Sequence, residues 1–459
     1  MRGATVVDMA ATTLLILGAS GDLTSRLLLP ALGQLLRLEP DREIALLGAG
    51  SDPLDAERWR RTVADAFLAS GAEGELRRVG ATTYHQVDAT EAAALLGLLS
   101  PIDGDLVIYF ALPPAVTRAA VEALAAVPLP ARTVLALEKP FGDDVASARS
   151  LNELLRRLVP EERIFRVDHF LGRSTLLNLL GVRFANRVLG PAWSAEHIES
   201  VDIRFDETLA LEGRARYYDH AGAMIDMIQS HLLQVLSLVA LEPPSALDAE
   251  QLRAAKTAAL RATRIWGDDP GSASRRARYA AGRIGDCEVG AYVDEPGVDA
   301  ARGTETYAEL LCEVRTERWA GVPFRLRSGK ALGRKRSEVS LRMRPVRHLP
   351  AGFTGDVPDG GRLTIAMGPD ELRLELNTTG GTDPFQLRRS TLSSSLGDGQ
   401  LLAYSEILGG ILDGDMPLAV RAEAAEECWR ILQPVRDAWS RGDVPLETYA
   451  AGSDGPPRL

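Results

Sequence analysis

Two histidines and one aspartate have the types and spacing for acid–base chemistry. Asp168 and His169 are adjacent in the run 166–172, and His231 lies in an otherwise apolar stretch that is predicted to be helical. A histidine oriented by a carboxylate is a general base near neutral pH. A lone histidine on an apolar face is more often a satisfied core residue, so this interpretation requires a carboxylate elsewhere in the chain. Neighbours on a strand point opposite ways, so Asp168 and His169 are expected to differ in role.

Lysine is rare in this chain. Among 52 basic residues, the only lysines are Lys139, Lys256, Lys330 and Lys335. A compact ammonium and a planar guanidinium are not interchangeable in a tight site, so these lysines are candidates for positions where the smaller cation matters. Chance survival of any one of them is the alternative. Lys139 follows a predicted strand, where it can face cofactor and substrate together, or form a salt bridge before an ordinary Pro-Gly turn.

A glycine turn between the first predicted strand and the first predicted helix has the form of a coenzyme-binding turn. It reads Gly18, Ala19, Ser20, Gly21, Asp22 and Leu23. Glycines there let backbone amides approach a pyrophosphate, whose charge the helix N-terminus favours. Alone this motif is weak, because such turns are common. After the second predicted strand, Asp52 either binds a ribose or caps the following helix.

The first third of the chain alternates apolar runs with amphipathic ones, which predicts repeated strand–helix units. Strands are expected at 13–17, 43–48, 105–112 and 133–137, and helices at 23–38, 56–69, 115–126 and from about 143 to 158. Such units form a parallel sheet covered on both faces. Residues 1–175 are therefore expected to form an α/β, Rossmann-like dinucleotide-binding domain.

The pattern changes after about residue 175. Alternating segments at 201–205, 338–343 and 362–366 accompany helical stretches at 221–239 and 251–262, and the tail 452–459 is too polar and proline-rich to be core. Period-two alternation favours an antiparallel sheet with one face on helices. Residues 176–459 are therefore expected to form an α+β domain with a large, mainly antiparallel sheet.

Composition excludes several classes of protein. The net charge of -11 and pI near 5.3 argue against nucleic acid or an anionic membrane as a main partner. No apolar run approaches the roughly 18–20 residues that span a bilayer. Cys287, Cys312 and Cys428 lie far apart without CxxC spacing, so neither disulfides nor a metal site is expected. The compartment is expected to be the cytoplasm.

Several motifs together resemble the glucose-6-phosphate dehydrogenase family, and the similarity covers nearly the whole chain. They are GASGDL at 18–23, EKPFG at 138–142, RVDHFLGR at 166–173, LLNLLGVRFAN at 176–186, the stretch 226–234, and RSGKAL at 327–332. Each motif is modest, but their shared order is very specific. The resemblance implies oxidation of the C1 hydroxyl of a phosphorylated hexose to a lactone, the first step of the oxidative pentose phosphate pathway. It also implies a homodimer or homotetramer that associates through the sheet of the second domain.

The resemblance implies roles for individual residues. His231 matches the base that takes the C1 hydroxyl proton, and Asp168 matches the acid that holds its imidazole. His169 and Arg173 match positions that bind the substrate phosphate. Further positions that contact sugar or phosphate are Lys139, Glu212, Asp226, Lys330 and Lys335. The coenzyme, NADP or NAD, is assigned to Gly18, Ser20, Gly21, Asp22, Leu23, Ser51 and Lys139.

The chain departs from the family's usual pattern mainly at the coenzyme end. Leu27 stands where the family usually has a lysine, and Ser51 where an arginine commonly grips the 2′-phosphate of NADP. Phe170 replaces the usual tyrosine, and Arg173 the usual lysine. These departures leave NADP, NAD and another hydride acceptor open. The alternatives are a related dehydrogenase with another sugar or acceptor, and a non-catalytic binding paralogue.

Overall fold

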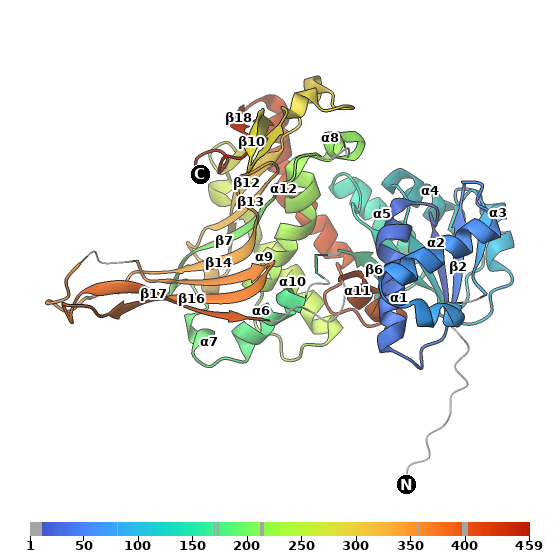
Figure 1. The fold of residues 1–459 in the computed structure, drawn as a ribbon, viewed down its shortest axis with the longest axis horizontal. Helices are drawn as coiled ribbons and strands as arrows, with labels where there is room; N and C mark the ends of the chain where they lie inside the picture. The colour runs from blue at the N-terminus through green and yellow to red at the C-terminus, as the bar shows by residue number, and fades with distance from the viewer. Residues whose placement is uncertain are drawn as a thin grey trace, which may run out of the picture. The chain divides into compact units, whose positions relative to one another are not determined.

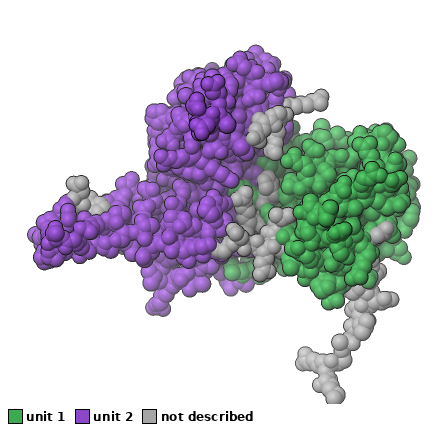
Figure 2. Space-filling model, viewed as in Figure 1, with its two compact units in different colours: residues 1–173, 247–253, 400–426 green, residues 174–246, 254–399, 427–459 purple. Residues whose placement is uncertain are grey.

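The computed structural model describes residues 12–79, 81–168, 170–171, 174–211, 215–355, 359–396 and 403–459. The chain divides into two compact units, coloured separately in Figure 2. Unit 1 comprises 1–173, 247–253 and 400–426, and unit 2 comprises 174–246, 254–399 and 427–459. The units are therefore interleaved along the sequence, because two later segments return to unit 1.

Unit 1 contains a six-stranded sheet in the order β3-β2-β1-β4-β5-β6, with every neighbouring pair parallel. Its strands are β1 Thr12–Leu17, β2 Ile44–Gly50, β3 Thr83–Gln86, β4 Leu106–Phe110, β5 Val134–Glu138 and β6 Ile164–Val167. Strands such as β4 are buried along their whole length, as expected for a sheet covered on both faces. This strand order is that of dinucleotide-binding folds, and it confirms the expected α/β architecture.

Helices flank this sheet (Figure 1). They are η1 Thr24–Leu28, α1 Leu29–Leu38, α2 Ala56–Ala69, η2 Glu73–Val79, α3 Ala92–Leu99, α4 Pro114–Leu124, α5 Val145–Leu158, η3 Glu161–Arg163 and α11 Ala403–Asp413. Helix α5 starts just after Asp144, close to the predicted start near residue 143, and the side chains of Asp144 and Ser147 form a capping box. Helix α11 packs on α1, where the Ser405 hydroxyl donates to the Ala31 carbonyl at 3.0 Å.

Unit 2 is built on a ten-stranded sheet in the order β17-β16-β15-β14-β7-β13-β12-β9-β18, with β8 paired to β12. The strands are β7 Ile198–Asp206, β8 Thr263–Ile265, β9 Ser274–Ala280, β12 Tyr307–Val314, β13 Phe324–Gly329, β14 Arg336–Met343, β15 Arg362–Met367, β16 Asp370–Thr379, β17 Leu387–Ser395 and β18 Leu446–Ala450. Only the β7–β13 and β9–β18 pairs are parallel among the described strands of this sheet. The expected mainly antiparallel sheet is confirmed.

The remaining elements of unit 2 are mostly helices. They are α6 Ser174–Phe184, α7 Leu189–Ala192, α8 Ala215–Ala223, η4 Met224–Leu232, α9 Leu233–Ala240, α10 Ala249–Ala262, α12 Ala422–Arg441, the turns η5 Trp266–Asp268, η6 Tyr292–Asp294, η7 Ala300–Arg302 and η8 Glu317–Trp319, and the small hairpin β10 Gly282–Ile284 with β11 Cys287–Val289. The first turns of α10 and α12 fall in unit 1. Segment η4 packs against β12 and β13, and α6 against β15.

Two expectations about unit 2 need correction. The stretch Tyr217–Ala240 does reach the length and hydropathy of a membrane span, but 89% of its apolar window is buried inside the protein, as in the core helix of a folded domain. The tail after β18 is not detached from the core, because Gly452 donates its amide to the Ala331 carbonyl at 2.8 Å and Pro456 is buried.

Candidate active site

The glycine turn lies at the point where the strand order of unit 1 reverses, between β1 and β4. Gly18 has φ +88°, and a Cβ there would lie 2.2 Å from the Ala111 carbonyl oxygen, so only glycine fits. The helix that follows begins at Asp22 and has π-type hydrogen bonding over η1. Its first amides have no partner within the helix and favour an anion. The turn is therefore shaped for a pyrophosphate.

The loop after β2 is fixed by side chains from two neighbouring elements. The Ser20 hydroxyl donates to Asp52 Oδ2 at 2.6 Å, and the Tyr84 hydroxyl donates to the Asp52 carbonyl at 2.8 Å. The following helix α2 is capped by Asp55, which accepts from the Arg58 amide at 2.7 Å. The capping alternative for Asp52 is therefore wrong, and its ribose alternative stays a prediction.

The carboxyl group of Glu138 connects the ends of β4 and β5 to the start of α11. Glu138 Oε1 accepts from the Tyr109 hydroxyl at 2.5 Å and from the Tyr404 hydroxyl at 3.1 Å. Desolvation by the surrounding protein raises the pKa of Glu138 to about 7, against the effects of the two tyrosines and of Lys139. The Asp168 carboxylate raises this pKa further. Lys139 and Asp168 therefore both lie close enough to Glu138 to affect its charge. The sequence alone suggested no role for Glu138.

Asp168 stands just beyond strand β6, which ends at Val167. Its side chain is 1% exposed, and Oδ1 accepts from the Phe170 amide at 2.9 Å in a tight turn. The expectation that Asp168 lies on a strand is therefore wrong, because β6 ends at Val167, and His169 lies outside the described residues. The turn instead fixes the Asp168 carboxylate relative to Phe170.

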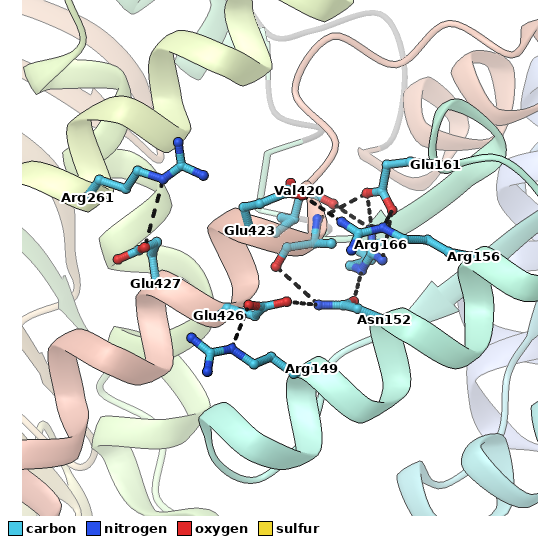
Figure 3. Close-up of polar contacts among 11 residues, drawn as sticks. Arg149, Asn152, Arg156, Glu161, Arg166, Arg261, Val420, Glu423, Glu426 and Glu427 are labelled. Atoms are coloured by element: carbon cyan, nitrogen blue, oxygen red, sulfur yellow. Dashed lines mark hydrogen bonds and ion pairs between the residues drawn. The ribbon is translucent and has the colours of Figure 1, made fainter.

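Arg166, at the start of the same motif, is a structural anchor (Figure 3). It is fully buried, donates to Asn152 Oδ1 at 3.0 Å, and pairs with Glu161 Oε1 at 2.7 Å. Burial lowers the pKa of Arg166, whereas the pKa of Glu161, which burial alone would raise, is lowered by Arg166. Glu161 Oε1 also accepts from the Ala422 amide at 3.1 Å, so the pair ties β6 to the start of α12.

The same network extends along α5 to the first turn of α12 (Figure 3). Asn152 Nδ2 donates to Glu426 Oε1 at 2.9 Å, and Arg156 donates to Glu423 Oε1 at 2.6 Å. Arg149 pairs with Glu426 at 3.1 Å. These contacts fix α5 against the start of α12, and Asn152 connects them to Arg166 of β6 within unit 1.

In unit 2, His231 and Asp226 lie on the π-helical segment η4. They are five residues apart, which is the hydrogen-bonded spacing of a π-helix, a rare conformation that is frequent at functional sites. His231 is 1% exposed, and Asp226 is half-buried and accepts from the Tyr217 hydroxyl at 3.3 Å. A buried histidine on such a segment fits either a base or a core residue.

A kink at Gly222 precedes the segment η4, which begins at Met224. Gly222 has φ +65°, and a Cβ there would lie 2.4 Å from Glu305 Oε1. The same oxygen accepts from the Met224 amide at 3.0 Å, so Glu305 caps the start of η4. Burial raises the pKa of Glu305 to about 7, and the Met224 amide works in the opposite direction. Glu305 could not be found from local sequence patterns, because its partner Met224 is 81 residues away.

Lys330 and Lys335 occupy the connection from β13 to β14, which crosses the end of β7. Lys330 Nζ pairs with Glu207 Oε2 at 2.7 Å and lies 5.2 Å from the Tyr218 ring centre. Ala331 follows with φ +50°, a strained conformation for a residue with a side chain. Lys335 is exposed just before β14. Lys330 is thus positioned by fixed partners, whereas Lys335 is at the surface.

Three residues assigned from the sequence lie outside the described residues. They are His169, Arg173 and Glu212. Within unit 1 the structure brings together the glycine turn with the loop after β2, and Lys139 with Asp168 around Glu138. Within unit 2 it places Asp226 and His231 on one turn of η4.

Comparisons with known proteins assign both parts of the chain. A sequence model described as the NAD binding domain of glucose-6-phosphate dehydrogenase matches residues 15–178, and one described as its C-terminal domain matches residues 180–459. The curated glucose-6-phosphate 1-dehydrogenase of Gluconobacter oxydans (strain 621H) is 39% identical over 464 residues, covering 96% of this chain and 94% of that protein. The enzyme of Mycolicibacterium smegmatis is 36% identical over 469 residues, with coverage of 96% and 93%.

Solved structures agree with this assignment. A crystal structure of glucose-6-phosphate 1-dehydrogenase from Mycobacterium avium has a TM-score of 0.85 at 34% identity and covers 97% of this chain and 95% of that one. A glucose-6-phosphate dehydrogenase in complex with its substrate glucose-6-phosphate has a TM-score of 0.87 at 29% identity, with the same coverage.

The dinucleotide-binding sheet with its glycine turn, joined to a mainly antiparallel sheet that carries η4, defines the chain as an NAD(P)-dependent oxidoreductase that acts on a CH-OH donor. More narrowly, the chain belongs to the glucose-6-phosphate dehydrogenase family.

Proposed function

We propose that the chain oxidises the C1 hydroxyl of glucose 6-phosphate to 6-phosphogluconolactone and uses a nicotinamide coenzyme as hydride acceptor. The observation that carries the proposal is the match of both domains, over nearly the full length, to one enzyme family. When bound, the nicotinamide supplies the acceptor for the C1 hydride. The protein supplies binding, orientation and proton transfer.

His231 acts as the general base that takes the C1 hydroxyl proton at an imidazole nitrogen, and Asp168 orients that imidazole. The fixed turn at Asp168 and the rigid helical setting of His231 support these roles, because a base must be held within hydrogen-bond reach of its proton. A carboxylate partner also stabilises the imidazolium that proton transfer produces. A core histidine, the alternative, has no need of such a partner.

The remaining assignments concern binding. Substrate contacts are assigned to Lys139, His169, Arg173, Glu212, Asp226, Lys330 and Lys335, of which His169 and Arg173 meet the phosphate. A dianionic phosphate is matched by clustered cations, and sugar hydroxyls by carboxylate acceptors. The coenzyme pyrophosphate lies against the turn from Gly18 to Leu23, and the close approach of Gly18 to Ala111 supports a backbone cradle there.

We further propose that the protein is a cytoplasmic homodimer or homotetramer that associates through the sheet of unit 2. On that sheet, Leu363 and Ile365 of β15 are buried, and their partners Leu374 and Leu372 continue the same apolar face onto β16. Leu392 of β17 lies opposite Leu374 and is 60% exposed. The apolar face therefore extends beyond what the described residues of one copy cover, which supports a second copy.

The test is turnover of glucose 6-phosphate by the purified protein with NADP, NAD and a deazaflavin acceptor in parallel. We expect reduction of at least one nicotinamide coenzyme, with 6-phosphogluconolactone as the product. Turnover of a different hexose phosphate, but not of glucose 6-phosphate, would favour the related-dehydrogenase alternative. No turnover with any sugar or acceptor, from protein that still binds coenzyme, would favour the non-catalytic paralogue.

A further inference from the structure

The loop at the end of β2 holds one carboxylate in a fixed place. Ser20 of the glycine turn donates to Asp52 Oδ2 at 2.6 Å. Tyr84 of β3 donates to the Asp52 carbonyl, and Gln86 of β3 donates to the Ser51 carbonyl at 3.1 Å. The loop is thus attached to the turn on one side and to the next strand on the other. The bonds to Tyr84 and Gln86 fix the backbone of the loop, and the bond to Ser20 orients the Asp52 carboxylate.

The chemistry of this carboxylate suits an uncharged diol. Ser20 occupies one oxygen, and a carboxylate has about four lone-pair sites, so acceptors remain for two vicinal hydroxyls. At the end of the second strand of a dinucleotide-binding sheet, an acid meets the adenosine ribose of NAD, whereas an arginine accommodates the 2′-phosphate of NADP. A 2′-phosphate dianion placed here would be repelled by Asp52 and would displace its bond to Ser20.

No cation in the loop offsets this repulsion. The residue before Asp52 is Ser51, which has no charge, and Asp52 forms no ion pair with any of the described residues. Helix α2, which follows, carries the exposed Arg58, Arg60 and Arg61. Arg61 is already paired with Glu57 at 2.8 Å.

We propose that Asp52, held by Ser20, binds the adenosine ribose diol and makes the chain selective for NAD over NADP. This inference rests on the proposed function only in taking a nicotinamide dinucleotide as the coenzyme. The ribose of NAD donates both hydroxyls to the carboxylate. In NADP the 2′-phosphate removes one donor and adds charge of the same sign.

The experiment is isothermal titration calorimetry in the absence of sugar, with NAD⁺ and NADP⁺ and with the fragments adenosine 5′-monophosphate and adenosine 2′,5′-bisphosphate. We expect NAD⁺ and the monophosphate to bind at least about tenfold more tightly than their 2′-phosphorylated counterparts. Asp52→Asn is expected to reduce that ratio about tenfold, by weakening NAD⁺ and strengthening NADP⁺. Adding Ser51→Arg to Asp52→Asn is expected to reverse the preference.

Two control variants isolate the effect of Asp52. Asp41→Asn removes the same charge from an exposed position before the start of β2, whereas Asp52 follows its end. We expect this variant to leave the ratio of NAD⁺ to NADP⁺ affinity unchanged. Arg58→Gln is also expected to leave the ratio unchanged, and a loss of NADP⁺ affinity in that variant would contradict the proposal. Equal or tighter NADP⁺ binding by the unmodified protein would overturn it, as would an Asp52→Asn variant that weakens both coenzymes equally. Tight NAD⁺ binding without turnover of glucose 6-phosphate would instead reject the proposed function and leave this inference standing.

Discussion

Glu138 illustrates how a single residue near the site can be overlooked in a sequence. The sequence motif 138–142 draws attention to Lys139 and not to Glu138. In the structure, however, one carboxyl oxygen of Glu138 accepts hydrogen bonds from the hydroxyl groups of Tyr109 and Tyr404. Burial raises the pKa of both tyrosines, so they remain neutral donors at physiological pH. Tyr404 lies 266 residues from Glu138 in sequence, so no local pattern could reveal the cluster. Arg166 is a second example, because its burial depends on Glu161 and Asn152.

We expect Glu138 to make stability depend on pH. Its pKa is about 7 in the folded chain and near the ordinary value of 4.5 in the unfolded chain. Between these values the folded state keeps a proton that the unfolded state has lost, so stability falls as pH rises, by at most about 3 kcal/mol. Glu138→Gln has no carboxyl group to titrate, so its stability does not fall in this way as the pH rises. Relative to the unmodified protein, its Tm should therefore rise between pH values of about 5 and about 8.

The measurement is calorimetry of the unmodified protein, Glu138→Gln and Glu153→Gln at both pH values. Glu153 is an exposed glutamate on α5, so its variant should track the unmodified protein. A Tm difference for Glu138→Gln that is the same at both pH values would show that Glu138 titrates normally.

At the scale of elements, sequence patterns predicted helices and strands well where local signals are strong. Helix α2 has the predicted bounds 56–69, and α5, at 145–158, lies close to its predicted range. The stretch 221–239 was predicted as one helix, but Gly222 breaks it and η4 is π-helical. Hydrophobic spacing reports which face is buried and not the backbone angles, so neither feature could be predicted. The kink depends on Glu305, which comes from a distant part of the chain.

We expect Gly222→Ala to disrupt the segment that carries His231. The added Cβ meets Glu305 Oε1 at 2.4 Å and imposes a left-handed conformation on alanine, which should destabilise the protein by more than about 1 kcal/mol. The matched control is Gly181→Ala on α6, where a Cβ has open space and should be neutral or slightly stabilising. Tm and kcat should both fall only for Gly222→Ala. A Gly222→Ala variant with normal Tm and kcat would mean that this kink does not constrain η4.

At the scale of the whole molecule, the order of motifs along the sequence predicted the family and the two kinds of sheet. It did not predict that residues 400–426 belong with the first unit, because the apolar face of α11 is complementary to α1 only in three dimensions. The sequence also did not predict that an apolar face of β16 and β17 is exposed. Strand alternation shows which residues share a face, but not which part of that face is covered by helices.

We expect Leu392→Arg to weaken self-association at least tenfold, about 1.4 kcal/mol, by placing a charge on that apolar face. Val188→Arg changes an apolar side chain that is 84% exposed outside the sheet, and it should leave the assembly intact. Sedimentation equilibrium measures both. A monomeric unmodified protein, or equal effects of the two variants, would exclude the sheet face as the interface.

The central claim is that His231 is the base for oxidation of glucose 6-phosphate. The most direct measurement is the initial rate of coenzyme reduction by the unmodified protein, His231→Asn and His197→Asn with saturating glucose 6-phosphate. His197 is exposed, so its variant controls for the substitution itself. We expect His231→Asn to lose about 10²–10⁴-fold in kcat, whereas His197→Asn keeps normal activity. Near-normal kcat in correctly folded His231→Asn would contradict it.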